Sequence, residues 1–119
     1  MNEGVKMPFV KWLNPENLPK EKVISKKIEA FEYFCLKIYE AYGNKSDNDL
    51  SPLKLQKLLF LTCAASIDKE GANEGLLSIF DNWYAMPYGH IEKDIYDYTR
   101  KNEGEFSRFK LSKFKMELK

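Results

Sequence analysis

The feature that most restricts the fold is a helical repeat of apolar residues between positions 22 and 42. Six apolar side chains recur there at alternating steps of four and three residues. They are Ile24, Ile28, Phe31, Cys35, Ile38 and Tyr42. This spacing places all six on one face of an α-helix, which needs another apolar surface to pack against. Gly43 and Asn44 follow at once and suit the left-handed residue that closes a helix.

A second helix is predicted from Ser51 onward. Ser51 offers an N-cap hydroxyl, and Pro52 follows at the first helical position, where a missing amide hydrogen costs no hydrogen bond. The body of this helix, LKLQKLLFLTCAAS, is apolar around most of its circumference. We therefore expect it to lie at the centre of the fold. Its core-facing residues include Leu55, Leu58 and Leu59. Its solvent edge is expected at Lys54, Gln56 and Lys57.

Five aromatic residues and the only histidine of the chain fall within positions 83–99. The preceding residues, 76–83, are apolar but too short and irregular to decide between a helical turn and a short extended piece. A turn is predicted from Pro87 to Gly89. This concentration of aromatic side chains could form a catalytic pocket, a surface that grips another protein, or a packed corner of a small domain.

The third predicted helix begins after this turn, at His90. Glu92 and Asp94 would lie in its first turn, where the helix dipole favours negative charge. Lys93 and Asp97 are four residues apart and form a candidate surface ion pair. The inner stripe of this helix is expected at Ile91, Ile95 and Tyr98.

The two ends of the chain differ from the helical middle. Residues 1–21 contain three prolines, which exclude a long uninterrupted helix and predict an extended or turning arm. Between Phe106 and Met116, apolar and basic residues alternate, which is more typical of a strand. From Arg100 to Lys119 there are seven Lys or Arg against three Glu, a local excess of four positive charges. A strand here could pair with the arm at the other end.

One compact domain is the expected architecture. A chain of 119 residues with 44% hydrophobic positions has enough apolar material for a single core. We expect a mainly α fold, a small helical domain with about three to five helices, which allows a short β element formed by the chain ends. Residues 1–21 would be the N-terminal arm and 22–119 the single helical domain.

Two of these segments together resemble a known family. The run SPLKLQKLLFLTCAA is followed about twenty residues later by WYAMPYGHIEKDIY, and both fall within residues 50–98. The pair is similar to the Panacea domain, also called the SocA-like antitoxin or phage-associated GepA-like domain, of which this chain would be a short, divergent member. Besides Lys54, Gln56, Lys57 and Tyr96, the matching residues are Leu55, Leu58, Leu59, Trp83, Pro87, Tyr88, Gly89, Ile91 and Ile95. His90 stands where that family usually has proline.

The resemblance implies a mainly helical domain that works by binding. Its members typically act as the antitoxin that neutralises a toxin encoded beside it. The paired toxins are diverse, so the resemblance does not specify the toxin's chemistry.

The sequence offers little that would support catalysis. It has one histidine, two cysteines and scattered carboxylates, and it lacks a glycine-rich phosphate loop. A pairing of Cys63 with His90 is conceivable, but an isolated cysteine is more often a small buried hydrophobe. Cys35 and Cys63 lack metal-ligand or redox spacing, so neither a metal nor another cofactor is expected. We expect a protein that is not an enzyme.

The expected location is the cytoplasm. The first residues, MNEGVKMPFVKWL, have an apolar stretch broken by Lys11 and no small-residue cleavage site, unlike a signal peptide. No apolar run approaches the roughly 18 residues of a membrane span. Two buried free thiols suit a reducing compartment.

Protein binding is the favoured function. Trp, Tyr, Met and Arg supply much of the energy of protein interfaces, and aromatic residues gather around the predicted turn. We expect some to pack inward and others to contact a cognate toxin; self-association is left open. The candidate contacts are Lys54, Lys57, Tyr84, Met86, Tyr88, His90 and Tyr96. The alternative is a phage or mobile-element protein that binds nucleic acid through its basic, Phe-containing C-terminal segment, although the net charge of +1 makes a solvated edge the simpler interpretation.

Overall fold

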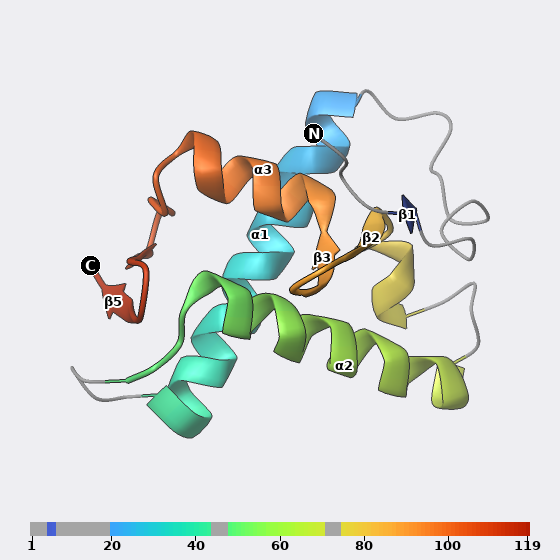
Figure 1. The fold of residues 1–119 in the computed structure, drawn as a ribbon, viewed down its shortest axis with the longest axis horizontal. Helices are drawn as coiled ribbons and strands as arrows, with labels where there is room; N and C mark the ends of the chain where they lie inside the picture. The colour runs from blue at the N-terminus through green and yellow to red at the C-terminus, as the bar shows by residue number, and fades with distance from the viewer. Residues whose placement is uncertain (1–4, 7–19, 44–47, 71–74) are drawn as a thin grey trace.

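Three α-helices and two small antiparallel sheets make up the part of the chain that the computed structural model describes, which is residues 5–6, 20–43, 48–70 and 75–119 (Figure 1). The helices are α1 (Lys20–Ile38, continued by a π-helical turn, Tyr39–Gly43), α2 (Pro52–Glu70) and α3 (Lys93–Lys101), with a short 3₁₀ turn at Gly75–Ser78. The strands are β1 (Val5–Lys6), β2 (Trp83–Met86), β3 (Gly89–Glu92), β4 (Phe109–Leu111) and β5 (Met116–Leu118). The fold is mixed, with helix in the majority, so the expectation of a mainly α domain with about three to five helices is confirmed only in its coarse form. Residues 44–47 and 71–74, and most of the predicted arm at 1–21, lie outside the described residues.

The two long helices begin and run as their sequences predict. The Ser51 side-chain oxygen accepts a hydrogen bond from the Lys54 amide at 3.2 Å, so Ser51 caps α2. In α1 the predicted stripe places Phe31 and Cys35 in the core, with exposures of 1% and 0%. Tyr42, predicted on the same face, is instead 75% exposed and lies in the π-helical turn that follows α1. In α2, Leu55 and Leu59 are fully buried, as expected for a central helix.

The third helix begins later than predicted. His90, Ile91 and Glu92, expected in its first turn, instead belong to strand β3 (Gly89–Glu92), and α3 starts only at Lys93. β3 pairs with β2 in an antiparallel hairpin that joins Trp83 to Glu92 and Met86 to Gly89. The turn between the strands is Pro87–Tyr88, and Gly89 follows with φ +128°, a conformation that a side chain would disfavour. Backbone pairing across this turn therefore replaces the helical turn that local sequence alone suggested.

The chain ends do form strands, but the predicted pairing between them is wrong. β5 pairs with β4 as a C-terminal hairpin, in which Phe109 lies opposite Leu118 and Leu111 lies opposite Met116. β1 instead pairs with β2 at the edge of the other sheet. The N-terminal strand thus pairs with β2 and the C-terminal strand with β4, and the two ends do not pair with each other.

The core lies where the three helices and the C-terminal hairpin meet. In Figure 1, α1 runs behind the other two helices, with α3 in front of its upper part and α2 in front of its lower part. β3 packs on α2, and α1 packs on α3. Besides the helix residues named above, the core contains Leu77, Phe80, Trp83, Ile95, Phe106, Phe109, Leu111 and Met116. The predicted aromatic segment and the C-terminal segment therefore both supply side chains to one core.

Candidate functional site

The β2–β3 hairpin is held against α2 by aromatic contacts. His90 stacks on Phe60 of α2, with ring centroids 4.0 Å apart and planes 6° from parallel. Phe60 also meets Trp83 edge to face at 5.4 Å. The indole Nε1 of Trp83 donates a hydrogen bond to the carbonyl oxygen of Phe80 at 2.7 Å. The hairpin face that carries Trp83 and His90 is therefore attached to α2.

A hollow of about 450 Å³ opens between the hairpin turn and the outer side of α2. We call it the turn hollow. It is lined by Leu53, Lys54, Lys57, Phe60, Leu61, Tyr88, Gly89, His90 and Ile91. Three apolar or aromatic side chains around it are about half exposed, namely Leu53 (50%), Leu61 (56%) and Tyr88 (49%). Such a cluster is more than the scattered single hydrophobes that any surface carries.

Four of the seven candidate contact residues meet at the turn hollow. Lys54 and Lys57 come from α2, Tyr88 from the turn and His90 from β3. Lys54 pairs with Asp49 at 2.6 Å, and this hydrogen bond lowers the pKa of the exposed Asp49 carboxyl. Basic groups therefore border an apolar hollow.

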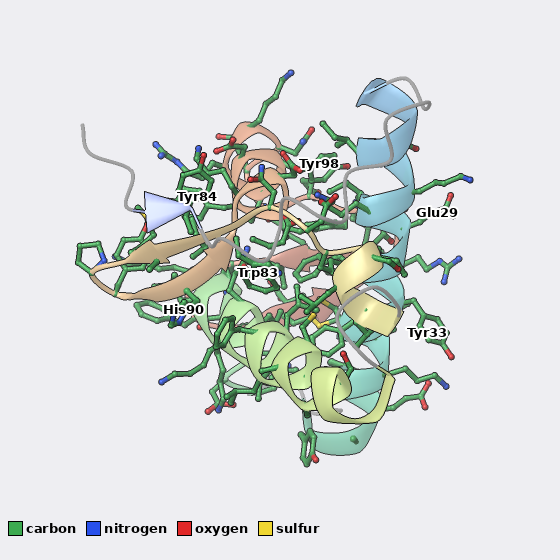
Figure 2. The ribbon with its side chains drawn as sticks, turned by 90° about the vertical axis from the view of Figure 1, so that its right-hand side faces the viewer. Glu29, Tyr33, Trp83, Tyr84, His90 and Tyr98 are labelled. Atoms are coloured by element: carbon green, nitrogen blue, oxygen red, sulfur yellow. The ribbon has the colours of Figure 1, made fainter. Side chains whose placement is uncertain are left out.

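The other three candidate contacts lie elsewhere. Met86 is buried, with 8% exposure, and offers little surface to a partner. Figure 2 shows Tyr84 on the side of the hairpin away from His90, next to β1. The guanidinium of Arg100 lies over the ring of Tyr96 in α3, with Cζ 5.6 Å from the ring centroid. Closeness to the turn in the sequence therefore did not predict which side chains line the turn hollow.

Tyr96 instead lines a second hollow of about 400 Å³, which we call the tail hollow. It lies between the start of α2, the end of α3 and the C-terminal hairpin. Its lining residues are Phe31, Pro52, Leu53, Gln56, Tyr88, Tyr96, Thr99, Arg100, Gly104, Leu111, Ser112 and Lys113. Leu53 and Tyr88 line both hollows, so the two are neighbours on one surface.

The residues of the resemblance motif divide between core and turn. Leu55, Leu59, Trp83, Ile91 and Ile95 are buried. Leu58 is partly buried, Pro87 is exposed in the turn, and Gly89 has the positive φ described above. The two motif segments thus build the two walls of the turn hollow, α2 on one side and the hairpin on the other.

Gln56 was expected at the solvent edge of α2, and this is wrong. Its side chain is 4% exposed and bonds both backbone groups of Glu92. The Glu92 amide donates to Oε1 of Gln56 at 2.8 Å, and Nε2 of Gln56 donates to the Glu92 carbonyl at 3.3 Å. Because β3 ends there, its last backbone groups need a partner, and Gln56 replaces a missing strand.

A buried charge cluster joins α1 to the far end of the same hairpin. The Lys27 ammonium of α1 is 1% exposed and contacts three carboxylates. Its Nζ lies 2.7 Å from Asp81, 2.7 Å from Glu92 and 2.6 Å from Asp94. Glu92 is fully buried and also accepts from the Asn82 and Ile95 amides, the second of which makes it the N-cap of α3. One side chain from α1 thus ties together both ends of the hairpin and the start of α3.

The cluster holds three carboxyl groups against the single ammonium of Lys27. Burial by itself would lower the pKa of Lys27, but Glu92 and the hydrogen bonds to Asp81 and Asp94 outweigh it and raise that pKa above its ordinary value. Burial, together with the nearby charge of Asp94, raises the pKa of Glu92 to about 7 despite the opposing effect of Lys27. Glu92 therefore exchanges its proton near neutral pH.

We predict that Glu92→Gln makes stability less dependent on pH. The pKa of Glu92 is raised in the folded state, from 4.5 to about 7, so its favourable contribution is complete below pH 4.5 and is lost as pH rises through 7. The stability of the variant relative to the native chain should increase by roughly 3 kcal/mol between pH 4.5 and 8. Urea unfolding followed by circular dichroism at several pH values measures this difference. Glu29→Gln, an exposed change on α1, should leave the dependence as it is, and a Glu92→Gln curve parallel to that of the native chain would contradict the prediction.

Asp81, Glu92 and Asp94 also have the oxygen donors that a divalent cation needs. In this fold, however, Lys27 lies among these oxygens and supplies the positive charge itself. The sequence carried one signal of this cluster: Lys27 lies three residues after Ile24, on the apolar stripe of α1. A lysine on that stripe must find buried carboxylates, but which ones depends on tertiary contacts.

The two cysteines are free thiols buried in the core, as expected. Burial, with a smaller contribution from Glu92, raises the pKa of Cys63 to about 12. Burial and the nearby Glu32 also raise the pKa of Cys35. Both sulfurs are therefore protonated at neutral pH, which is unfavourable for a nucleophile.

A scan against protein-family models and searches of curated proteins and of solved structures find no match to this chain. The likeness to the Panacea domain therefore depends on the motif residues alone. Within the described residues, none of the helices has the length and apolar character needed to cross a membrane.

Proposed function

We propose that the chain is an antitoxin-like binding protein that neutralises a cognate toxin by direct protein contact. The observation that carries this proposal is the turn hollow, where Leu53, Leu61 and Tyr88 are half exposed around a concave apolar surface. A half-exposed apolar cluster of this kind, with charges at its rim, is typical of a protein-binding site.

The resemblance to the Panacea domain supports the same surface. The helix motif and the turn motif supply its two walls, so a feature shared with that family would lie where a partner could touch it. The buried Lys27 cluster and Gln56 hold the hairpin in place behind the surface. A preformed surface loses less conformational entropy on binding, which favours a stable complex.

The proposed mechanism is occlusion without catalysis. The toxin would be covered by the turn and by the outer side of α2, and the chain would carry out no reaction on it. The protein would act in the reducing cytoplasm, where Cys35 and Cys63 stay as free thiols.

The test is co-expression with the product of the adjacent open reading frame, scored by growth and by co-purification. We expect the neighbour to be toxic alone and to form a stable complex with this chain. Tyr88→Ala should weaken the complex by about tenfold or more, because truncating a central aromatic residue removes much of the binding energy. The dissociation constant is measured by titration calorimetry, and rescue of growth is scored in parallel.

Tyr33→Ala is the matched control for this substitution. Tyr33 is 62% exposed and, like Glu29, projects from α1 on the side away from the hairpin (Figure 2). Tyr33→Ala should leave both the affinity for the neighbouring protein and the rescue of growth unchanged. A harmless neighbour that does not co-purify would refute the antitoxin function, and equal losses in the two tyrosine variants would move the contact away from the turn hollow.

Nucleic-acid binding through the C-terminal hairpin is the second candidate. Phe114 is 73% exposed there, and the Lys113 ammonium lies 5.6 Å from its ring centroid. An exposed aromatic ring beside a cation suits a stacked base and its phosphate. In the same purification, co-eluting nucleic acid that is lost steeply as salt rises would favour this candidate.

A further inference from the structure

Two cationic side chains line the tail hollow. Arg100 at the end of α3 and Lys113 after β4 both line it and are exposed. Each lies near a ring, Arg100 at Tyr96 and Lys113 at Phe114, but within the described part of the chain neither has a carboxylate partner. Arg100 is thus held on a ring face while the edge of its guanidinium stays open to a planar anion.

Three other polar side chains of the tail hollow already have hydrogen-bond partners within the protein. Gln56 is bonded to the backbone of Glu92, Thr99 Oγ1 donates to the Ile95 carbonyl at 2.8 Å, and Ser112 Oγ donates to the Lys115 carbonyl at 3.1 Å. The rest of the lining is mainly apolar or aromatic. An occupant that complements this hollow therefore needs an apolar body and a negative charge.

We propose that the tail hollow binds an apolar side chain lying next to a carboxylate on a protein partner. This inference rests on the proposed function and names the chemistry of the toxin segment that would dock there. Because Leu53 and Tyr88 line both hollows, one extended segment can cover the turn hollow and continue into the tail hollow. That continuity favours a polypeptide segment over a separate small molecule, and the two cations select an acidic one.

The first experiment measures the chemistry of the hollow without the toxin. Two probes of nearly equal shape, 4-phenylbutyrate and its neutral amide, are titrated into the full chain while backbone amides are followed by two-dimensional NMR. We expect 4-phenylbutyrate to shift the amides of Gly104 and Ser112 with a dissociation constant in the millimolar range, as suits so small a ligand. The neutral amide should bind at least about fivefold more weakly, since it lacks the charge that Arg100 and Lys113 recognise.

A matched pair of double variants locates the effect. Arg100→Gln with Lys113→Gln should weaken 4-phenylbutyrate binding about fivefold or more. Lys101→Gln with Lys110→Gln removes the same charge from exposed neighbours that do not line the hollow, and should leave binding unchanged. Equal binding of acid and amide, no shifts at the two amides, or equal loss in both double variants would overturn the proposal.

The second experiment uses the complex with the neighbouring protein. The Arg100 and Lys113 double variant should weaken it about tenfold or more, and the control double variant should not. A wild-type complex that is indifferent to Arg100 and Lys113 would overturn the proposed acidic segment while leaving the antitoxin function standing. If a single-stranded oligonucleotide displaces 4-phenylbutyrate, nucleic acid occupies the hollow, and the proposal is likewise overturned. Absence of any wild-type complex would refute the proposed function, and the probe titration would then decide the chemistry of the hollow by itself.

Discussion

Lys27→Met is expected to lower the free energy of unfolding by about 3–5 kcal/mol at neutral pH. Methionine has a similar length and fills much of the same space, so lost packing contributes little to this effect. What is lost is the only cation in contact with Asp81, Glu92 and Asp94 among the described residues. Two of these carboxylates are almost fully buried, and their charges would then be uncompensated.

The penalty in Lys27→Met should become smaller as the pH falls. Without Lys27, the pKa of Glu92 rises further in the folded state because Lys27 no longer lowers it, so the folded variant binds a proton that the unfolded chain does not. Stability then increases as pH falls from 8 toward 5, and protonation relieves part of the repulsion. Urea unfolding at pH 5 and at pH 8 measures this change.

Lys26→Met provides the control for this prediction. Lys26 is the adjacent residue in α1 but is exposed, and removing its charge should alter stability by no more than about 0.5 kcal/mol. If the two methionine variants were equally stable, Lys27 would not be holding buried carboxylates together, and the described attachment of the hairpin to α1 would be wrong.

Gly104→Ala is expected to destabilise the chain by about 2–5 kcal/mol, with the damage centred on the C-terminal hairpin. Gly104 has φ +80°, a conformation that costs an L-residue roughly 1–2 kcal/mol. A Cβ there would also overlap the carbonyl group of Leu111. This backbone cannot move away easily, because the Leu111 amide donates to the Gly104 carbonyl at 2.8 Å. Overpacking of this kind adds about 1–3 kcal/mol.

Hydrogen exchange shows where Gly104→Ala acts. Amides of β4 and β5 should lose protection first, since Phe109, Leu111 and Met116 reach the core only when the hairpin docks. Gly89→Ala is the matched control. The alanine would also have to adopt a positive φ, but its Cβ would meet nothing within 4 Å. It should loosen the β2–β3 turn and leave β4–β5 protected. Unchanged protection of β4–β5 in Gly104→Ala would contradict the prediction.

Local patterns were sufficient for the long helices. The stripe from Ile24 to Ile38 and the cap at Ser51 depend on neighbours within a few residues, so the sequence predicts them without knowledge of the rest of the fold. The ion pair between Lys93 and Asp97, found at 2.7 Å, has the same local origin. The strand character of the C-terminal segment was also visible, since alternation requires no knowledge of the partner strand.

The third helix shows where such patterns fail. The acidic Glu92 makes the segment from His90 to Glu92 suitable for the start of a helix, but the same segment can also pair as a strand. Only its contact with Trp83–Met86 decides between the two. The same holds for the pairing of the chain ends, because any edge strand can accept either one. Long-range backbone pairing thus overrode local preference.

By itself, the sequence determined two long helices, a turn at Pro87, buried cysteines and the apolar residues available for a core, all of which depend on local spacing or on hydrophobicity. Only the tertiary structure decided that Gln56 and Lys27 face inward, that Met86 is buried while Tyr88 is half exposed, and that four of the seven candidate contacts meet at one hollow. The physical reason is that a buried polar group is stable only beside a specific partner, and the partners of Lys27 and Gln56 lie 36 or more residues away. Which carboxylates contact Lys27, and which backbone groups bond to Gln56, follows from how the elements pack together.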